Sequence, residues 1–226
     1  MSASLEEVLC FQGAFRAVMD AFAHPGRPFA LPRVQAGARH ALAGMEEPLT
    51  LLTRLFVDQA TTFCVAPGCD KRLELEIAAE THAHPASPEE AAFVIVPRAA
   101  DDESLEVAVM HASAGTLLSP ERGATVLIGC GLLSEGGAVS GCAQIEVSGP
   151  GVKGTGTFAT DRTAWERARA WRADEFPCGI DILLCDAQGQ VVGVPRTAAV
   201  ARRESDAREG VPTRADVRAG EKNGGR

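Results

Sequence analysis

The chain has 226 residues, of which 46% are hydrophobic and 23% are charged, and its formal net charge at pH 7 is −8. This composition is typical of a soluble globular protein and excludes a disordered, collagen-like or disulfide-scaffold chain. Because a nucleic-acid-binding surface needs clustered lysine and arginine, the acidic balance argues against nucleic acid as a partner. The sequence contains no apolar run long enough for a transmembrane helix, so we expect no membrane partner.

The start of the chain lacks the basic residues, apolar stretch and small-residue cleavage site of a secretory signal. The seven cysteines are odd in number and irregular in spacing, which favours reduced thiols over a disulfide framework. We therefore expect a cytoplasmic protein whose cysteines behave mostly as small buried hydrophobic residues.

Apolar residues recur at helical spacing near the start of the chain and predict an amphipathic helix over Leu5–Ala23. His24-Pro25-Gly26 ends this helix, because proline disfavours helix in the residue before it. A second helix is predicted from Pro48 to Phe56, followed by a strand over Thr61–Ala66. The segment Lys71–Ala79 fits a helix, although its aliphatic residues also alternate as they would in a strand.

The second half of the chain alternates short apolar strands with one charged helix. The predicted elements are strands over Phe93–Val96 and Leu105–Val109, a hairpin of Ala124–Leu132 and Val139–Val147 turning at residues 134–137, a helix over Asp161–Ala173, and strands over Ile180–Leu184 and Val191–Val194. Helices interleaved with short strands predict an α/β fold, a mixed sheet with helices packed on it.

From about Ala201 onward, basic and acidic residues alternate and branched aliphatic residues are almost absent. Such a segment cannot bury enough apolar surface to offset the entropy lost on ordering. We therefore expect one domain over residues 1–200 and a flexible charged tail over residues 201–226, with ordering of the tail on a partner as the alternative.

Cys64, Cys69, His82 and His84 follow one another as zinc-finger ligands do, but a single residue separates the two histidines. A finger of that type needs about three to five residues there, so chance spacing is the favoured interpretation and no metal is expected. No Cys-x2-Cys pair is present for an iron–sulfur cluster. The sequence also lacks a Gly-x-Ser-x-Gly elbow, and no residue is assigned a catalytic role.

A pyridoxal enzyme needs a lysine held in a desolvated pocket for its Schiff base. The lysines of this chain are Lys71, Lys153 and Lys222, which lie in a charged turn, a glycine-rich loop and the expected tail. None of these contexts predicts such a pocket, so we expect no cofactor.

Two places are candidates for binding an anion. In the loop Gly149-Pro150-Gly151, consecutive backbone N–H groups in tight turns can form an anion nest, with Lys153 adding a cation. The alternative is a loop that merely terminates a sheet. Arg196 beside Thr197 places a planar five-donor cation next to a hydroxyl, which suits a phosphate or a partner's carboxylate, and a surface salt bridge is the equally weighted alternative.

Four stretches, taken together and in order, carry a resemblance to one protein family. These four family stretches are Phe15-Arg16-Ala17-Val18-Met19-Asp20-Ala21-Phe22-Ala23-His24-Pro25-Gly26; Gly115-Thr116 with Ser119-Pro120-Glu121-Arg122-Gly123-Ala124-Thr125; Val147-Ser148-Gly149-Pro150-Gly151-Val152; and Phe176-Pro177 with Gly179-Ile180-Asp181, closing with Val194-Pro195-Arg196-Thr197. From about Phe15 to Val200 the chain resembles PhnH, the H subunit of the carbon–phosphorus lyase system for phosphonate use. Each stretch alone is weakly specific, whereas the ordered set is specific.

The resemblance implies a fold similar to the large domain of pyridoxal-dependent transferases, without the cofactor. It also implies a homodimer that joins the G, I and J subunits in a core complex. With the G, I and L subunits, the family helps to transfer the ribose triphosphate of ATP to a phosphonate, displacing adenine and giving alpha-D-ribose 1-methylphosphonate 5-triphosphate. The radical lyase step belongs to the J subunit.

Within the four family stretches, a set of residues is expected to have structural or interface roles: Arg16, Pro25, Gly26, Glu121, Gly123, Asp181 and Pro195. Pro25-Gly26 shapes a turn, Glu121 caps or pairs locally, and Asp181 at a strand end is either a turn-former or a ligand contact. Two functions are therefore weighed. The first is an accessory subunit without independent activity, and the second is a stand-alone small-molecule enzyme with an anion pocket near Lys153 and Arg196.

Overall fold

The structure is a computed structural model that describes residues 5–33, 41–42, 44–137, 139–172 and 174–203. Its helices are α1 (Leu5–Ala23), α2 (Glu47–Phe56), α3 (Lys71–Thr81), α4 (Asp102–His111) and α5 (Ala164–Trp171). Its strands are β1 (Phe29–Ala30), β2 (Thr62–Val65), β3 (His84–Pro85), β4 (Phe93–Val96), β5 (Ala114–Thr116), β6 (Ser119–Gly123), β7 (Thr125–Cys130), β8 (Leu133–Glu135), β9 (Ala143–Ser148), β10 (Gly156–Thr160), β11 (Asp181–Asp186), β12 (Gln190–Val194) and β13 (Ala199–Arg203).

A seven-stranded mixed sheet forms the centre of the protein, in the order β1-β12-β11-β7-β4-β2-β3. The strands from β11 to β3 run parallel to one another, and at one edge β12 pairs antiparallel with β11 and β1 pairs antiparallel with β12. The central strands are apolar almost throughout, as strands buried on both faces must be. The expected α/β class, with a mixed sheet and helices packed on it, is confirmed.

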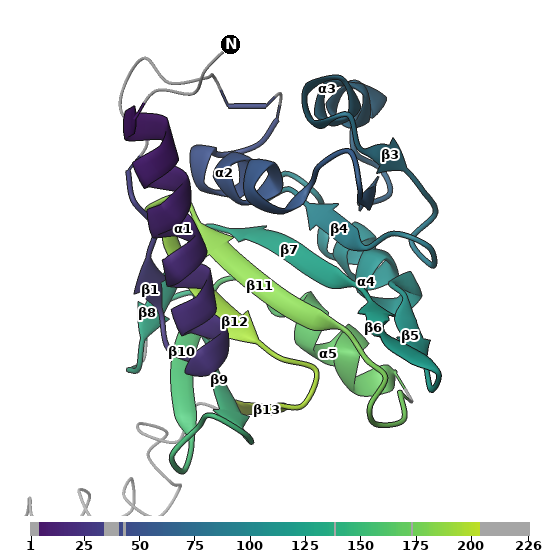
Figure 1. Cartoon of the computed structure of the whole chain (residues 1–226). Helices are drawn as coiled ribbons and strands as arrows, with labels where there is room; N and C mark the ends of the chain where they lie inside the picture. Colours follow the sequence, from purple (N-terminus) through teal and green to yellow (C-terminus); the bar gives the residue numbers. More distant parts are fainter. Residues whose placement is uncertain (1–4, 34–40, 43, 138, 173, 204–226) are drawn as a thin grey trace, which may run out of the picture.

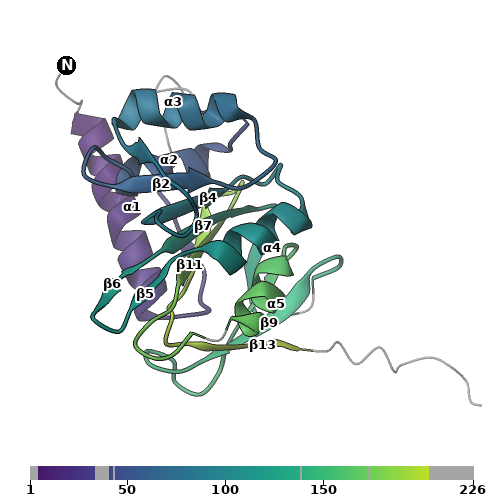
Figure 2. The same cartoon turned by 90° about the vertical axis from the view of Figure 1, so that its right-hand side faces the viewer.

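Two layers cover the two faces of this sheet (Figures 1 and 2). Helices α1, α2 and α3 pack on one face around Leu52, Ile95 and Leu127. On the other face, α4 and α5 pack together with a second sheet around Trp165 and Val126. That second sheet has four antiparallel strands in the order β13-β9-β10-β8, and β5 pairs with β6 in a separate hairpin.

Two predicted elements are wrong. Residues Leu105–Val109 belong to helix α4, which begins where the Asp101 carboxylate accepts a hydrogen bond from the backbone N–H of Ser104 at 2.8 Å. This cap and the helical packing of Leu105 and Val109 into the core outweigh the short alternating pattern. The predicted hairpin of Ala124–Leu132 and Val139–Val147 is also absent, because β7 lies in the central sheet and β9 in the four-stranded one.

Other predictions agree with the structure or are extended by it. Helix α1 has the predicted bounds Leu5–Ala23, and the two strands predicted over Ile180–Leu184 and Val191–Val194 are present as β11 and β12, which pair antiparallel. The ambiguous segment after Asp70 is a helix, capped by the carboxylate of that residue. Strand β13 extends to Arg203, so the first residues assigned to the tail pair with β9, while residues 204–226 lie outside the described residues. None of the described helices combines the length and the apolar character needed to cross a membrane.

Candidate functional site

A cavity of about 470 Å³ lies where the first residues of β7 and β11 approach the end of α1. Its lining comes from five separate parts of the chain: Phe22, Ala23, Thr125, Pro150, Gly151, Asp181, Pro195 and Thr197. Thr125 and Asp181 are paired neighbours at the start of two parallel strands, which fixes their distance across the sheet. All four family stretches contribute to this lining, although they are far apart in sequence.

The turn after α1 forms one wall of the site. Gly26 has φ of +78°, in the left-handed region that favours glycine, and its N–H donates to the carbonyl of Gly193 on β12 at 3.3 Å. A Cβ at Gly26 would lie 3.0 Å from the side chain of Val147. Pro25-Gly26 therefore lies in a turn that is fixed against two different sheets.

The loop Gly149-Pro150-Gly151 forms the adjacent wall by packing on the end of α1. Gly151 has φ of +82°, and a Cβ there would lie 2.7 Å from the carbonyl oxygen of Ala23. The turn is closed by a hydrogen bond from the N–H of Val152 to the carbonyl of Gly149 at 3.1 Å. The two glycines thus let the backbone of this loop pack closely against the backbone of neighbouring segments. This is a structural role, which is the alternative to an anion nest.

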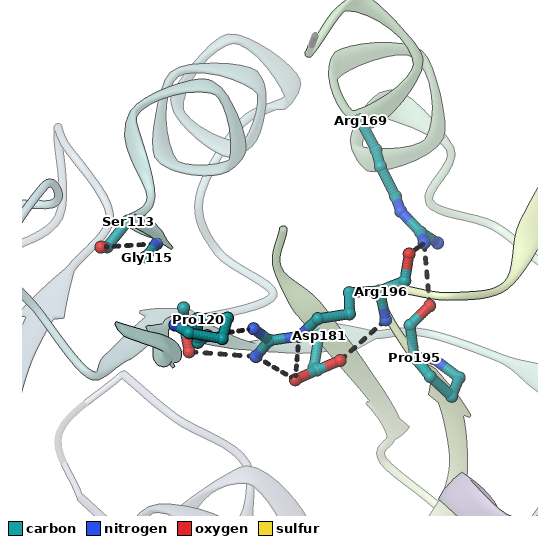
Figure 3. Close-up of polar contacts among 8 residues, drawn as sticks. Ser113, Gly115, Pro120, Arg169, Asp181, Pro195 and Arg196 are labelled. Atoms are coloured by element: carbon teal, nitrogen blue, oxygen red, sulfur yellow. Dashed lines mark hydrogen bonds and ion pairs between the residues drawn. The ribbon is translucent and has the colours of Figure 1, made fainter. Parts of the chain in front are cut away.

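Arg196 and Asp181 form the base of the site (Figure 3). The Asp181 carboxylate accepts hydrogen bonds from the backbone N–H of Arg196 at 2.7 Å and from its Nη2 at 2.6 Å. The guanidinium also donates to the carbonyls of Pro120 at 2.6 Å and Gly123 at 3.3 Å. A Cβ at Gly123 would collide with this guanidinium, so the glycine is needed where Arg196 crosses β6. Of the roles weighed for Arg196, the structure shows a salt bridge, one that is intramolecular and half-buried.

Arg169 on α5 holds the segment that follows β12 and was not singled out by the sequence. Its Nη2 donates to the carbonyls of Pro195 at 2.8 Å and Ala198 at 2.9 Å, and Figure 3 shows it above Arg196. Burial lowers the pKa of the Arg169 guanidinium, while the carboxylate of Asp181 acts in the opposite direction. No local motif marks this residue, because its partners lie more than twenty residues away in sequence.

The residues expected from the sequence divide into three groups. Gly151, Asp181, Pro195 and Thr197 line the cavity, and a second set surrounds it in the walls just described: Pro25, Gly26, Gly123, Gly149 and Arg196. The third group is Arg16, Glu121 and Lys153, which are exposed and do not line it. Phe22, Thr125 and Pro150 line the cavity and were missed as individual candidates, although each belongs to a family stretch.

The lining suits a ligand with both polar and apolar parts. It offers one carboxylate, two threonine hydroxyls, a phenyl ring and two proline rings, and the described lining contains no basic side chain. The Asp181 carboxylate is already compensated by Arg196. Across the described ranges, no cluster of three or more histidine, cysteine or acidic residues could hold a metal ion.

Fold and site together define an α/β protein with a solvent-open pocket at one end of its parallel strands. The sequence model of the family described as "Bacterial phosphonate metabolism protein (PhnH)" matches residues 4–201. The chain is also 30% identical over 189 residues to "Putative C-P lyase subunit protein HtxG" of Stutzerimonas stutzeri, covering 82% of this chain and 83% of that protein. The chain belongs to the PhnH family of bacterial phosphonate metabolism proteins.

Proposed function

We propose that this protein is an accessory subunit of the carbon–phosphorus lyase core complex. In this role it works with the G, I and L subunits in transferring the ribose triphosphate of ATP to a phosphonate. A phosphonate oxygen forms the new bond to the ribose carbon as the bond to adenine breaks, and adenine leaves. The proposal includes a cytoplasmic location, assembly with the G, I and J subunits, and a homodimer when the chain is alone.

One observation carries this proposal. The four family stretches, separated by up to about 175 residues (Phe22 to Thr197), converge on a single cavity. Residues that merely stabilise a fold are spread through its core, whereas these gather around one space large enough for part of a substrate. The family match over residues 4–201 and the relative named as a C-P lyase subunit support the same assignment.

If other subunits bind the phosphates, the lining of this cavity needs no basic side chain. Its lining includes a compensated carboxylate and two hydroxyls but no basic group to neutralise a triphosphate. We infer that other subunits hold the phosphates, and that this chain contributes a wall or a positioning surface. We further infer a fold similar to the large domain of pyridoxal-dependent transferases, used here without that cofactor.

Reconstitution of the transfer reaction tests the proposal. Purified G, I and L subunits are mixed with ATP and methylphosphonate, and adenine release is measured with and without this chain. We expect release to require the chain, and Thr125→Val with Thr197→Val to reduce it by removing hydroxyls while keeping the side-chain shape. Thr155→Val, at an exposed position in the neighbouring loop, is the matched control and should leave release unchanged.

Two results would contradict the proposal. Adenine release that does not depend on the chain would remove it from the reaction, and failure to co-purify with the G, I and J subunits would remove it from the complex. Turnover of ATP and phosphonate by the purified chain alone would instead support the stand-alone enzyme with an anion pocket near Lys153 and Arg196.

A further inference from the structure

The cavity contains polar groups that the described part of the chain leaves available to a ligand. A carboxylate has about four acceptor positions. Arg196 fills three of those on Asp181, through its backbone N–H at 2.7 Å, Nε at 3.1 Å and Nη2 at 2.6 Å (Figure 3). The Asp181 side chain is still 24% exposed, so its remaining position is accessible from the cavity. Neither the Thr125 nor the Thr197 hydroxyl has a hydrogen-bond partner among the described residues.

Two of these groups lie on the same face of the central sheet. Thr125 and Asp181 are paired in register on the parallel strands β7 and β11, so their side chains point to one side. Side chains alternate along a strand, and Leu127 and Leu183, two residues further on, belong to the core that α1 covers. The hydroxyl and the carboxylate therefore lie on the α1 side, on neighbouring strands that are about 4.8 Å apart. This spacing lets them contact neighbouring atoms at one edge of a single ring.

The rest of the lining offers flat apolar surface. Phe22, close to the end of α1, contributes a phenyl ring, and Pro150 and Pro195 contribute proline rings from two other segments. Aromatic side chains are platforms on which nucleobases stack. Because the described lining contains no basic side chain to pair with an anion, the combination suits a flat, neutral ring with a polar edge.

Among the groups that take part in the proposed transfer, one matches this lining. The triphosphate and the phosphonate are anions, which a carboxylate without a neighbouring basic lining residue disfavours. The ribose is neutral but has no flat aromatic face to lie on Phe22. Adenine is neutral and flat, and its N6 amino group donates hydrogen bonds beside the N7 acceptor. This order complements a carboxylate that lies next to a hydroxyl.

We propose that the cavity binds the adenine ring, with Asp181 accepting a hydrogen bond from the amino group, Thr125 donating to the neighbouring ring nitrogen, and Phe22 covering one face. This inference rests on the proposed function and deepens it by naming the part of the nucleotide that this chain holds. The base of ATP and the adenine released from it present the same chemistry, and the test separates these two sources.

Titration of the purified full chain with purines, followed by calorimetry, tests the hydrogen-bonding pattern. We expect adenine to bind. Hypoxanthine, which has a carbonyl oxygen in place of the amino group, should bind at least about tenfold more weakly, because two acceptors then face each other. Similar affinities for adenine, adenosine and ATP would identify the base of the nucleotide as the ligand. Binding of adenine without binding of adenosine would identify the released product, and both results support the site.

Substitutions in the lining test the assigned contacts. Thr125→Val and Phe22→Leu should each weaken adenine binding about threefold to tenfold, the first by removing a hydrogen bond and the second by removing the aromatic face while keeping apolar bulk. The matched controls are Thr155→Val and Phe15→Leu, at exposed positions outside the lining, and they should leave the affinity unchanged. Circular dichroism checks that each variant is folded, and the purine series on the unsubstituted chain needs no variant at all.

Four results would overturn the inference: no adenine binding at millimolar concentration, equal affinity for adenine and hypoxanthine, an affinity unchanged in both lining variants, or binding of ATP without binding of adenine. In the last case the phosphates would be the bound group. Reconstituted adenine release tests the proposed function separately. Release that requires a chain unable to bind adenine removes this inference alone, whereas adenine binding by a chain that release does not require removes the proposed function.

Discussion

The guanidinium of Arg196 is held by two other segments of the chain. Asp181 begins β11, while Pro120 and Gly123 belong to the β6 hairpin, and the arginine itself follows β12. A planar fork of five donors can serve all these acceptors at once, which a lysine cannot do. Arg196 therefore fixes the positions of two residues that line the cavity, Asp181 and Thr197. A direct contact of Arg196 with an anion stays a prediction.

We expect Arg196→Ala to lower the free energy of unfolding by about 2–3 kcal/mol, because it leaves two carbonyls without their donor and leaves the half-buried Asp181 carboxylate with only the backbone N–H of residue 196. Arg196→Lys should recover less than half of this loss, since it restores the charge but not the fork. Urea unfolding measures both. Arg122→Ala, exposed on the same hairpin, is the control and should change stability by less than about 0.5 kcal/mol. Equal losses at positions 122 and 196 would contradict the structural role of Arg196.

At the scale of elements, the cavity depends on how the loop after β9 meets the end of α1. Gly151 and Gly154 both lie in this loop and have nearly the same φ, +82° and +81°. They differ in what surrounds them. A Cβ at Gly151 would lie 2.7 Å from the Ala23 carbonyl, whereas nothing lies within 4 Å of a Cβ at Gly154. Comparing alanine substitutions at these two glycines therefore separates the cost of backbone strain from the cost of a clash between the loop and α1.

We expect Gly154→Ala to lower the free energy of unfolding by about 1–2 kcal/mol, the cost of a left-handed conformation for alanine. Gly151→Ala carries the same cost and must also push the loop away from α1, which adds about 1–3 kcal/mol. Chemical unfolding of the two variants measures the difference. Adenine release should fall for Gly151→Ala and stay near wild type for Gly154→Ala. Indistinguishable stabilities would show that the loop yields freely and does not form a fixed wall.

The sequence predicts those elements whose signals are local. Leu5–Ala23 combines a long apolar periodicity with a Pro-Gly stop, and its bounds agree with the structure. The same reasoning fails for Leu105–Val109, where a short window alternates by chance and the deciding signal is the cap at Asp101. Local patterns also fail to show that β7 and β9 belong to different sheets. An apolar run followed by an alternating run is typical of a hairpin, so the two strands were predicted to pair with each other.

The site was only partly predictable for a related reason. Asp181 and Thr197 were found because they stand in the family stretches, and both line the cavity. Phe22 and Thr125 lie in equally visible stretches, but only the packing of α1 against β12 in the central sheet brings them to the same space. Arg169 carried no local signal at all. Long-range packing, which periodicity does not encode, decides which motif residues meet.

At the scale of the whole molecule, the two layers bury the inner strands of the central sheet, and this fixes the state of the cysteines on them. Cys130 on β7 and Cys185 on β11 are fully buried, and Cys64 on β2 is nearly so. All the cysteines of the described residues are free thiols. Burial raises the pKa of the Cys130 and Cys185 thiols well above their ordinary value and raises the pKa of Cys64 to about 11.

These thiols predict that the protein loses stability in alkaline solution. Above the ordinary thiol pKa of 9.0 the unfolded chain releases protons that the buried thiols of the folded state keep. The contribution of these thiols to the free energy of unfolding is therefore complete below that pH and is lost as pH rises above it. At about pH 10, Cys130 and Cys185 should each cost about 1.4 kcal/mol. The sequence contains no tyrosine to ionise in the same range. Urea unfolding at about pH 8 and about pH 10 measures the loss of stability. The double variant Cys130→Ala with Cys185→Ala should lose most of the difference in stability between the two pH values, whatever its stability at the lower pH. A wild-type stability that is flat across this range would mean that water reaches the central sheet.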